Sequence, residues 1–172
     1  FRSLRAPAFD AGIFPVEFAR KDTGKIEALS GSTIALPEAV SNIYKGILRG
    51  VKDYVSKNGF EGVVLGLSGG IDSALCLAIA VDALGASAVQ AIMMPYRYTS
   101  DMSMEDAEKQ AALLGVDYQI LPIEAMVEAS NKTLADYFAG VQKDATEENI
   151  QARCRGIVLM AISNKTGRMV LT

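Results

Sequence analysis

Hydrophobic residues change from a scattered to a periodic arrangement near Pro37. Residues 1–36 are rich in Gly, Ser, Thr and Pro, and no helical or alternating period persists among their scattered Phe residues. After Pro37, which suits the first turn of a helix, apolar residues recur at helical spacing until Asn58-Gly59. These apolar positions are Val40, Ile43, Tyr44, Ile47, Leu48, Val51, Tyr54 and Val55. The pattern predicts an irregular arm or linker over 1–36, followed by an amphipathic helix.

Short apolar runs and helical segments alternate through the rest of the chain. Strands are predicted at 63–67, 89–94 and 118–123, and a fourth strand begins near Met169. Helices are predicted at 72–84, from Ser103 to Gly115, at 125–138 and at 146–163, and Ser103-Met104-Glu105-Asp106 resembles a capping box. This alternation predicts an α/β fold, a doubly wound parallel sheet covered on both faces and joined by right-handed crossovers. We expect one domain over 37–172.

Composition narrows the classes of function. The 172 residues are 50% hydrophobic, which is enough for one sizeable core. With 17 basic and 20 acidic residues the formal charge is −3, so charge gives no support for nucleic-acid binding. Histidine is absent, which excludes Ser-His-Asp, Cys-His and His-metal chemistries. Any catalysis must therefore rest on the placement of charges, and small molecules or proteins are the expected partners.

Cysteines and apolar runs indicate the compartment. Cys76 and Cys154 lie in apolar helical contexts without CxxC spacing, so we expect core thiols in a reducing, cytoplasmic protein. The longest apolar stretch is interrupted by Asp82 and falls short of the ~20 residues of a membrane-spanning helix, so no membrane association is expected. The chain has no initiator Met and no signal peptide, and it stops just after a strand has begun. We expect a fragment of a longer protein, without activity of its own.

One short segment carries a recognisable chemistry. Between a predicted buried strand and a predicted buried helix lies Ser68-Gly69-Gly70-Ile71-Asp72-Ser73, called here the 68–73 loop. Adjacent glycines allow a sharp turn and a close approach, so that backbone N–H groups and the helix N-terminus point at an anion. Two serines add hydroxyl donors. Asp72 would repel bare phosphate, and its carboxylate suits the Mg²⁺ that accompanies nucleotide phosphates; alternatively, it only stabilises the helix dipole.

Two better-known phosphate motifs are excluded by spacing. A Walker A loop requires a lysine after its last glycine, and none follows Gly70. The GxGxxG spacing of dinucleotide-binding folds is also missing. A plain Gly-Gly turn remains an alternative, although the flanking strand, helix, Ser and Asp disfavour it.

The 68–73 loop resembles the SGGxDS loop of the N-type ATP pyrophosphatases. Three segments together are similar to the synthetase domain of glutamine-dependent NAD synthetases: 65–74 (LGLSGGIDSA), 93–100 (MMPYRYTS) and 147–156 (EENIQARCRG). The resemblance implies an adenine-nucleotide alpha-hydrolase-like sheet of strand order 3-2-1-4. The switch point, where ligands bind outside the carboxyl ends of the strands, then lies between the first strand and the strand starting near Met169.

The family resemblance also implies a reaction and its components. ATP would be bound by Ser68, Gly69, Gly70, Ile71, Asp72 and Ser73, with its adenosine near the backbone of Met93, and Asp72 would hold Mg²⁺. The carboxylate of deamido-NAD (nicotinic acid adenine dinucleotide) would attack the α-phosphorus to give an acyl-adenylate and pyrophosphate, and ammonia would then displace AMP to give NAD. Glutamine would supply the ammonia through an amino-terminal glutaminase domain of the same polypeptide, absent from this chain. A homo-oligomer is also expected.

The helix predicted at 146–163 is expected to bind the second substrate. Its apolar stripe is predicted to comprise Ile150, Cys154, Ile157 and Ala161. Asn149 and Arg153, four residues apart, share a neighbouring face. The resemblance implies that both contact deamido-NAD, and an arginine fork suits a carboxylate or phosphate. Alternatively, Arg153 is solvated and pairs with Glu147 or Glu148; Arg155 lies on another face and is not included.

Three other functions remain open from the sequence. The first is another amide- or thio-forming ATP pyrophosphatase with a different acceptor. The second is a non-catalytic nucleotide-binding module, which would bind ATP without producing AMP. The third is an assembly or folding unit with no activity of its own.

Overall fold

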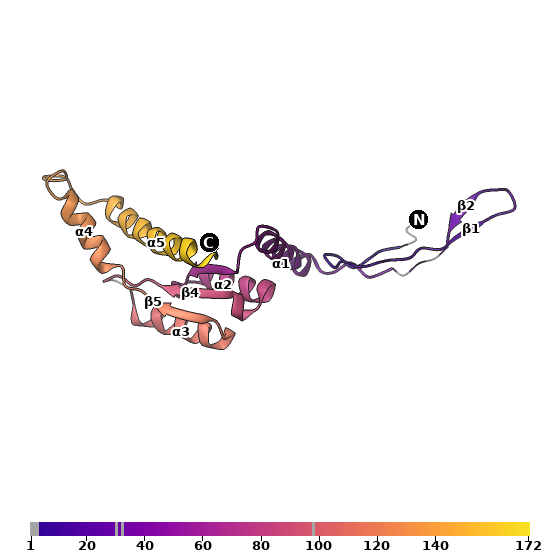
Figure 1. Cartoon of the computed structure of the whole chain (residues 1–172), viewed down its shortest axis with the longest axis horizontal. Helices are drawn as coiled ribbons and strands as arrows, with labels where there is room; N and C mark the ends of the chain where they lie inside the picture. Colours follow the sequence, from indigo (N-terminus) through magenta and orange to yellow (C-terminus); the bar gives the residue numbers. More distant parts are fainter. Residues whose placement is uncertain (1–3, 30, 32, 98) are drawn as a thin grey trace. The chain divides into compact units, whose positions relative to one another are not determined.

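The computed structural model describes residues 4–29, 31, 33–97 and 99–172, and Tyr98 of the 93–100 segment therefore lies outside it. The chain divides into two compact units, Phe1–Arg49 and Gly50–Thr172. Helix α1 (Ala39–Lys57), labelled in Figure 1, contains the residues on both sides of this division. The boundary predicted between an arm over 1–36 and a domain over 37–172 stays a prediction.

The first unit contains a hairpin that the sequence pattern did not indicate. Strands β1 (Phe18–Arg20) and β2 (Ile26–Ala28) pair antiparallel. The turn between them is closed by the Gly24 amide, which donates to the Lys21 carbonyl at 2.8 Å, and Gly24 has a φ of 79°. The prediction of an irregular segment is wrong here, because strands of three residues are too short to show an alternating pattern.

Helix α1 confirms the predicted amphipathic helix. Its carboxyl end is closed by Asn58, whose side-chain amide donates to the Tyr54 carbonyl at 2.8 Å. Gly59 follows with a φ of 72°. Near this end Val55 is 4% exposed and belongs to the core of the second unit.

The second unit is built on a parallel sheet of the predicted order. Its strands are β3 (Val63–Gly66), β4 (Val89–Met93), β5 (Asp117–Ile120) and β6 (Met169–Val170). They lie in the order β5-β4-β3-β6, which in chain order is 3-2-1-4, and each neighbouring pair is parallel. The predicted α/β fold and strand order are therefore confirmed. β3 and β6 meet where the connections change direction, which is the topological switch point.

The helices follow the prediction with shifted ends. They are α2 (Ile71–Leu84), α3 (Asp101–Leu114), α4 (Glu124–Leu134) and α5 (Ala145–Thr166), with a short 3₁₀ helix, η1 (Ala86–Ala88). The capping box predicted at Ser103 is wrong. Ser100 caps α3 instead, and its hydroxyl accepts the Ser103 amide at 3.2 Å. Ser103 is therefore already inside the first turn.

Helix α5 begins with a reciprocal capping box. The Asp144 carboxylate accepts the Thr146 amide at 2.8 Å, and the Glu147 carboxylate accepts the Asp144 amide at 3.0 Å. The hydrogen bonds from Thr146 hold the pKa of Asp144 below its ordinary value of 3.8. Two acidic residues in the first turn also match the positive end of the helix dipole.

Helices cover both faces of the parallel sheet (Figure 1). A separate core lies between the helices and the sheet on each face. Successive residues of a strand point to opposite faces, so Val63 and Leu65 belong to one core and Val64 to the other. The first core packs β3 and β4 against α1, α2 and α3 through Val55, Val63, Leu65, Leu67, Leu77, Ala80, Val89, Ala91, Ala107 and Ala111. The second packs the opposite face against α4 and α5 through Val64, Ile92, Met94, Ile123, Val127, Cys154 and Leu159.

The apolar stripe predicted for α5 is confirmed at Ile150 and Cys154 and wrong at Ile157 and Ala161. Cys154 and Leu159 are buried, with Ile150, Val158 and Ile162 partly buried beside them. Ile157, predicted to lie in the apolar stripe, is 58% exposed, and Ala161 is exposed as well. The buried arc of α5 therefore starts in the predicted stripe and extends to one side of it, through Val158, Leu159 and Ile162. Apolar side chains lie around much of α5, so the periodicity did not fix the buried face.

Candidate functional site

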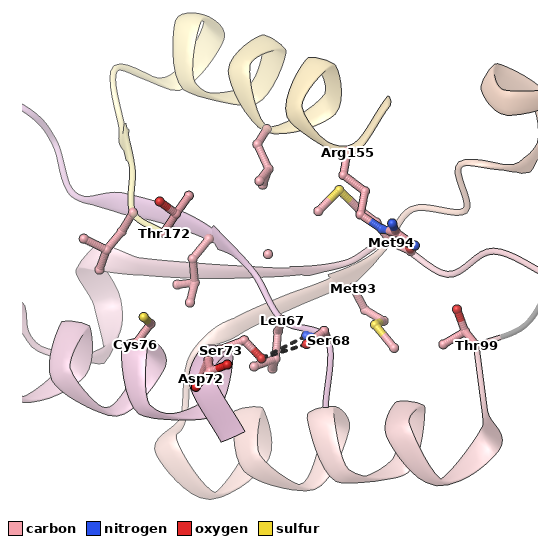
Figure 2. A pocket seen from close by; sticks show the side chains of 14 residues that line it. Leu67, Ser68, Asp72, Ser73, Cys76, Met93, Met94, Thr99, Arg155 and Thr172 are labelled. Carbon is pink, nitrogen blue, oxygen red and sulfur yellow. Dashed lines mark hydrogen bonds between the residues drawn. The ribbon is translucent and has the colours of Figure 1, made fainter. Parts of the chain in front are cut away.

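A cavity of about 360 Å³ lies at the carboxyl ends of β3, β4 and β6, at the predicted switch point (Figure 2). Its walls come from the ends of these strands, the start of α2, and two side chains of α5. The lining residues are Leu65, Gly66, Leu67, Ser68, Asp72, Ser73, Cys76, Met93, Met94, Thr99, Arg155, Leu159, Leu171 and Thr172. An apolar pocket of this size with a few polar groups is typical of a small-molecule site.

The 68–73 loop is shaped by hydrogen bonds among its own residues. The Ser73 hydroxyl donates to the Gly70 carbonyl at 2.9 Å and accepts the Ser68 amide at 3.2 Å. The Ser68 hydroxyl accepts the Gly70 amide at 3.3 Å and lies 3.1 Å from the Ser73 hydroxyl. Because the Ser73 proton goes to Gly70, Ser68 is the donor in that pair. The loop therefore keeps its turn through its own bonds.

Gly69 is required at its position for two reasons. Its φ is 79°, in the region that favours glycine, and a Cβ added there would lie 2.3 Å from the Ser103 carbonyl oxygen. The loop thus packs directly against the first turn of α3, and any side chain at Gly69 would push the two apart.

The N-terminus of α2 lies at the wall of the cavity. Gly70 is the N-cap with an extended backbone, and among the described residues no side chain caps this end. The first N–H groups of a helix have no acceptor within the helix, and the helix dipole adds positive potential. Asp72 lies in the first turn and lines the cavity with Ser68 and Ser73, as Figure 2 shows. This end suits an anion that carries its own cation.

The opposite wall is the end of β4. Met93 and Met94 are 2% and 6% exposed. The Met93 carbonyl accepts the Leu121 amide at 2.8 Å. The Met94 carbonyl accepts Nε of Arg155 at 3.3 Å, so this strand end is bonded to both the segment after β5 and α5.

The segment after β4 is fastened by a turn and by ion pairs. The Thr99 amide donates to the Tyr96 carbonyl at 2.8 Å, and the Tyr96 amide donates to the Thr99 hydroxyl at 3.0 Å. Arg97 pairs with Glu124 at 2.7 Å and with Glu128. The hydrogen bond to Glu124, followed by the charge of Glu128, raises the pKa of Arg97 above its ordinary value. These contacts hold Thr99 at the cavity wall.

The residues predicted to contact the second substrate lie apart from the cavity. Asn149 and Arg153 are exposed on α5, and Nη1 of Arg153 donates to the Asn149 carbonyl at 3.1 Å. Neither lines the cavity, whereas Arg155 does, although the sequence prediction left it out. Arg155 stands four residues before Leu159 and seven before Ile162, so it shares the buried side of α5 that the prediction missed. Ser68, Asp72, Ser73 and Met93 are brought together as predicted.

Acidic ligands are sparse at the site. Over 4–29, 31, 33–97 and 99–172, no group of three or more Asp, Glu, Cys or His residues is placed to hold a metal ion. Asp72 is the acidic side chain that lines the cavity. Within the same ranges, no helix combines the length and the apolar character needed to cross a membrane.

The decisive observation on identity comes from the sequence itself. The NAD synthase family pattern matches residues 43–172, which include the whole sheet and the cavity. The chain belongs to the NAD synthase family. The resemblance of its three segments to NAD synthetases is thereby confirmed, and so is the fold that this resemblance implied.

Individual NAD synthetases resemble the chain closely. A glutamine-dependent NAD(+) synthetase of Acinetobacter baylyi is 46% identical over 172 residues, which cover 99% of this chain and 31% of that protein. A structure of the glutamine-dependent NAD+ synthetase of Acinetobacter baumannii in complex with ADP superposes with a TM-score of 0.90 at 49% identity, covering 98% of this chain and 31% of the other. A structure of an NH3-dependent NAD synthetase of Campylobacter jejuni superposes with a TM-score of 0.68 at 29% identity, covering 78% of this chain and 56% of the other.

The chain spans about a third or less of the length of the glutamine-dependent NAD synthetases that it matches. The activity, substrates and partners of the whole protein are therefore proposals. The assignments of individual side chains to ATP, Mg²⁺ or deamido-NAD stay predictions.

Proposed function

We propose that the protein carrying this chain makes NAD by ATP-dependent amidation of deamido-NAD through an acyl-adenylate, with release of AMP and pyrophosphate. The observation that carries the proposal is the 68–73 loop, which opens α2 at the wall of a switch-point cavity in a chain of the NAD synthase family. The relatives named as NAD synthetases, one of them solved with ADP, support the same activity.

The ends of ATP would occupy opposite walls of the cavity. The N–H groups at the start of α2 would hold the pyrophosphate end, because the first amides of a helix have no acceptor within it. The hydroxyls of Ser68 and Ser73 would exchange their bonds within the loop for bonds to phosphate. The adenosine lies toward the backbone at Met93. No protein nucleophile is needed: positioning of the reactants and preorganised donors facing the departing pyrophosphate account for the catalysis. This agrees with the absence of histidine from the sequence.

Mg²⁺ fits the donor set at the cavity. In nucleotide sites this ion is held by one or two carboxylates together with phosphate oxygens and water, so a single lining carboxylate is compatible with it. Asp72 is that carboxylate. When bound, Mg²⁺ neutralises negative charge on the phosphates.

Asn149 and Arg153 are proposed to contact deamido-NAD from the exposed face of α5. Arg153 uses Nη1 on the Asn149 carbonyl, which leaves its other N–H donors for a carboxylate or phosphate. A second substrate must approach from outside the ATP cavity, and both side chains are exposed.

Glutamine is the proposed source of nitrogen. The relatives described as glutamine-dependent support this, and we assign the release of ammonia to a glutaminase domain of the same polypeptide. A homo-oligomeric, cytoplasmic enzyme is proposed as well.

The test is a reconstitution with the intact protein that carries this sequence. It is incubated with ATP, Mg²⁺, deamido-NAD and either glutamine or ammonium, while NAD, AMP and pyrophosphate are followed together. Equal amounts of NAD and pyrophosphate are expected with both nitrogen sources. Pyrophosphate release with another acid in place of deamido-NAD would favour a different ATP pyrophosphatase. ATP binding without AMP would indicate a nucleotide-binding module, and neither binding nor turnover would indicate a folding or assembly unit.

A further inference from the structure

Arg155 is a cation in an otherwise largely apolar cavity. Its side chain is partly buried and runs from α5 to the end of β4, where Nε donates to the Met94 carbonyl at 3.3 Å (Figure 2). A guanidinium group has five N–H donors in one plane, and this bond uses one of them. The bond therefore fixes the plane of the group and leaves both terminal nitrogens for other acceptors.

No carboxylate neutralises Arg155 in the part of the chain that the structure describes. Arg97 shows the contrast, since it is more exposed and yet pairs with Glu124 and Glu128. A partly buried charge without a counter-charge is costly, so a partner is expected to arrive with the ligand. Arginine forms bidentate hydrogen bonds with phosphate, and nucleotide phosphates are the anions of this site under the proposed function.

We propose that Arg155 binds the phosphate next to the ribose, the α-phosphate of the bound nucleotide. This rests on the proposed function, in which pyrophosphate lies at the 68–73 loop and adenosine at Met93. Arg155 is fastened to Met94, on the adenosine wall and away from that loop. The anionic group between adenosine and pyrophosphate is the α-phosphate. Arg155 is thus a second anion-binding element, on a different helix from the first.

The simplest alternative is a tether that only fixes the end of β4. A tether to one carbonyl needs one donor and no charge, whereas Arg155 brings a charge and four further donors into the cavity. The two roles differ in their ligand dependence. Loss of a tether would weaken the binding of adenosine and of AMP alike, whereas loss of a phosphate contact would weaken the binding of AMP alone.

The experiment measures binding of AMP and of adenosine to the intact protein by calorimetry. Arg155→Met keeps an unbranched apolar side chain in place of the aliphatic part of the arginine, and removes the guanidinium and its charge. Lys165→Met is the matched control, because it removes one exposed positive charge from the same helix. We expect Arg155→Met to weaken the binding of AMP about ten- to a hundred-fold, which corresponds to the loss of a charge-assisted hydrogen bond. The binding of adenosine should weaken less than about twofold. The control should change neither.

Equal weakening of AMP and adenosine by Arg155→Met would reduce Arg155 to a tether and overturn the inference. Normal binding of AMP by the variant would overturn it as well. If Arg155→Met shows the expected loss of AMP affinity but the unmutated protein makes no NAD, the proposed function is refuted and the inference stands. Failure of the unmutated protein to bind either ligand would refute both.

A second measurement needs no variant, and therefore holds even if Arg155→Met does not fold. Phenylglyoxal modifies arginine side chains, and mass spectrometry of peptides gives the rate at each one. At equal fractional occupancy, AMP should slow the modification of Arg155 more than adenosine does. Arg20, exposed and in the first unit, is the internal reference. Equal protection of Arg155 by both ligands contradicts the inference.

Discussion

Replacing Gly69 by alanine tests two constraints together: the left-handed backbone at this residue and its close contact with α3. The added Cβ would lie 2.3 Å from the Ser103 carbonyl oxygen, and the backbone has a φ of 79°. A left-handed φ costs a non-glycine residue about 1–2 kcal/mol. Forcing an atom into a packed backbone contact costs about 1–3 kcal/mol more. We therefore expect Gly69→Ala to lower the unfolding free energy by about 2–5 kcal/mol.

Gly115→Ala is the matched control for this substitution. Gly115 closes the other end of α3 with a φ of 68°, and a Cβ there would meet nothing within 4 Å. Gly115→Ala should therefore lower the unfolding free energy by only about 1–2 kcal/mol, which is the cost of the left-handed backbone alone. The difference between the two variants isolates the contact between the 68–73 loop and α3.

Urea unfolding of the intact protein gives the two free energies, and calorimetry gives the affinity for ATP in the folded state. Gly69→Ala should also lower the affinity for ATP, because separation of the loop from α3 displaces the amides of the 68–73 loop. Gly115→Ala should keep the affinity. Equal destabilisation by both alanines, together with unchanged ATP binding in Gly69→Ala, would refute this account of the loop.

Three further substitutions test separate parts of the site and fold. Asp72→Asn should abolish ammonia-dependent NAD formation and remove the dependence of ATP affinity on Mg²⁺; near-normal synthesis would exclude Asp72 as a metal ligand. Arg153→Ala should raise KM for deamido-NAD about ten- to a hundred-fold and KM for ATP much less, whereas equal increases would indicate a structural role. The folded pKa of Asp144 lies below its ordinary value of 3.8, so its carboxylate stabilises the fold above that pH and the effect is lost as pH falls through the lowered pKa. The difference in unfolding free energy between the parent and Asp144→Asn should therefore be constant above pH 3.8 and shrink below it, and a difference that persists in acid would contradict the assignment.

The parts of the fold that the sequence predicted are those with a strong local signal. The strands β3 and β4 are nearly continuous apolar runs, because parallel strands are buried on both faces. The 68–73 loop combines two glycines, two serines and a carboxylate at a strand–helix junction, and the structure places it at the cavity as expected. The strand order 3-2-1-4 came from the family resemblance, since no local pattern specifies which strands become neighbours.

What the sequence left undetermined depends on tertiary packing. Helix α5 carries apolar residues around most of its circumference, and only the sheet determines which of them are buried. The face containing Ile157 was as apolar as the face containing Val158. The buried side of α5 extends to Arg155, which stands four residues before Leu159, whereas Arg153 stays exposed, so the cavity arginine was missed. The capping serine of α3 was misplaced for a similar reason, because Ser100 and Ser103 are both suitable N-caps.

The unequal exposure of the two thiols offers a route to chemical labelling. Cys76 is partly buried at the cavity wall, one turn of α2 beyond Ser73, whereas Cys154 is 3% exposed in the second core. Within this chain, a small maleimide or a fluorinated alkylating reagent should react with Cys76 first, without removal of the other cysteine. A ¹⁹F probe at that position would sense occupancy of the cavity directly, and would allow ligand exchange to be followed by NMR in the absence of turnover.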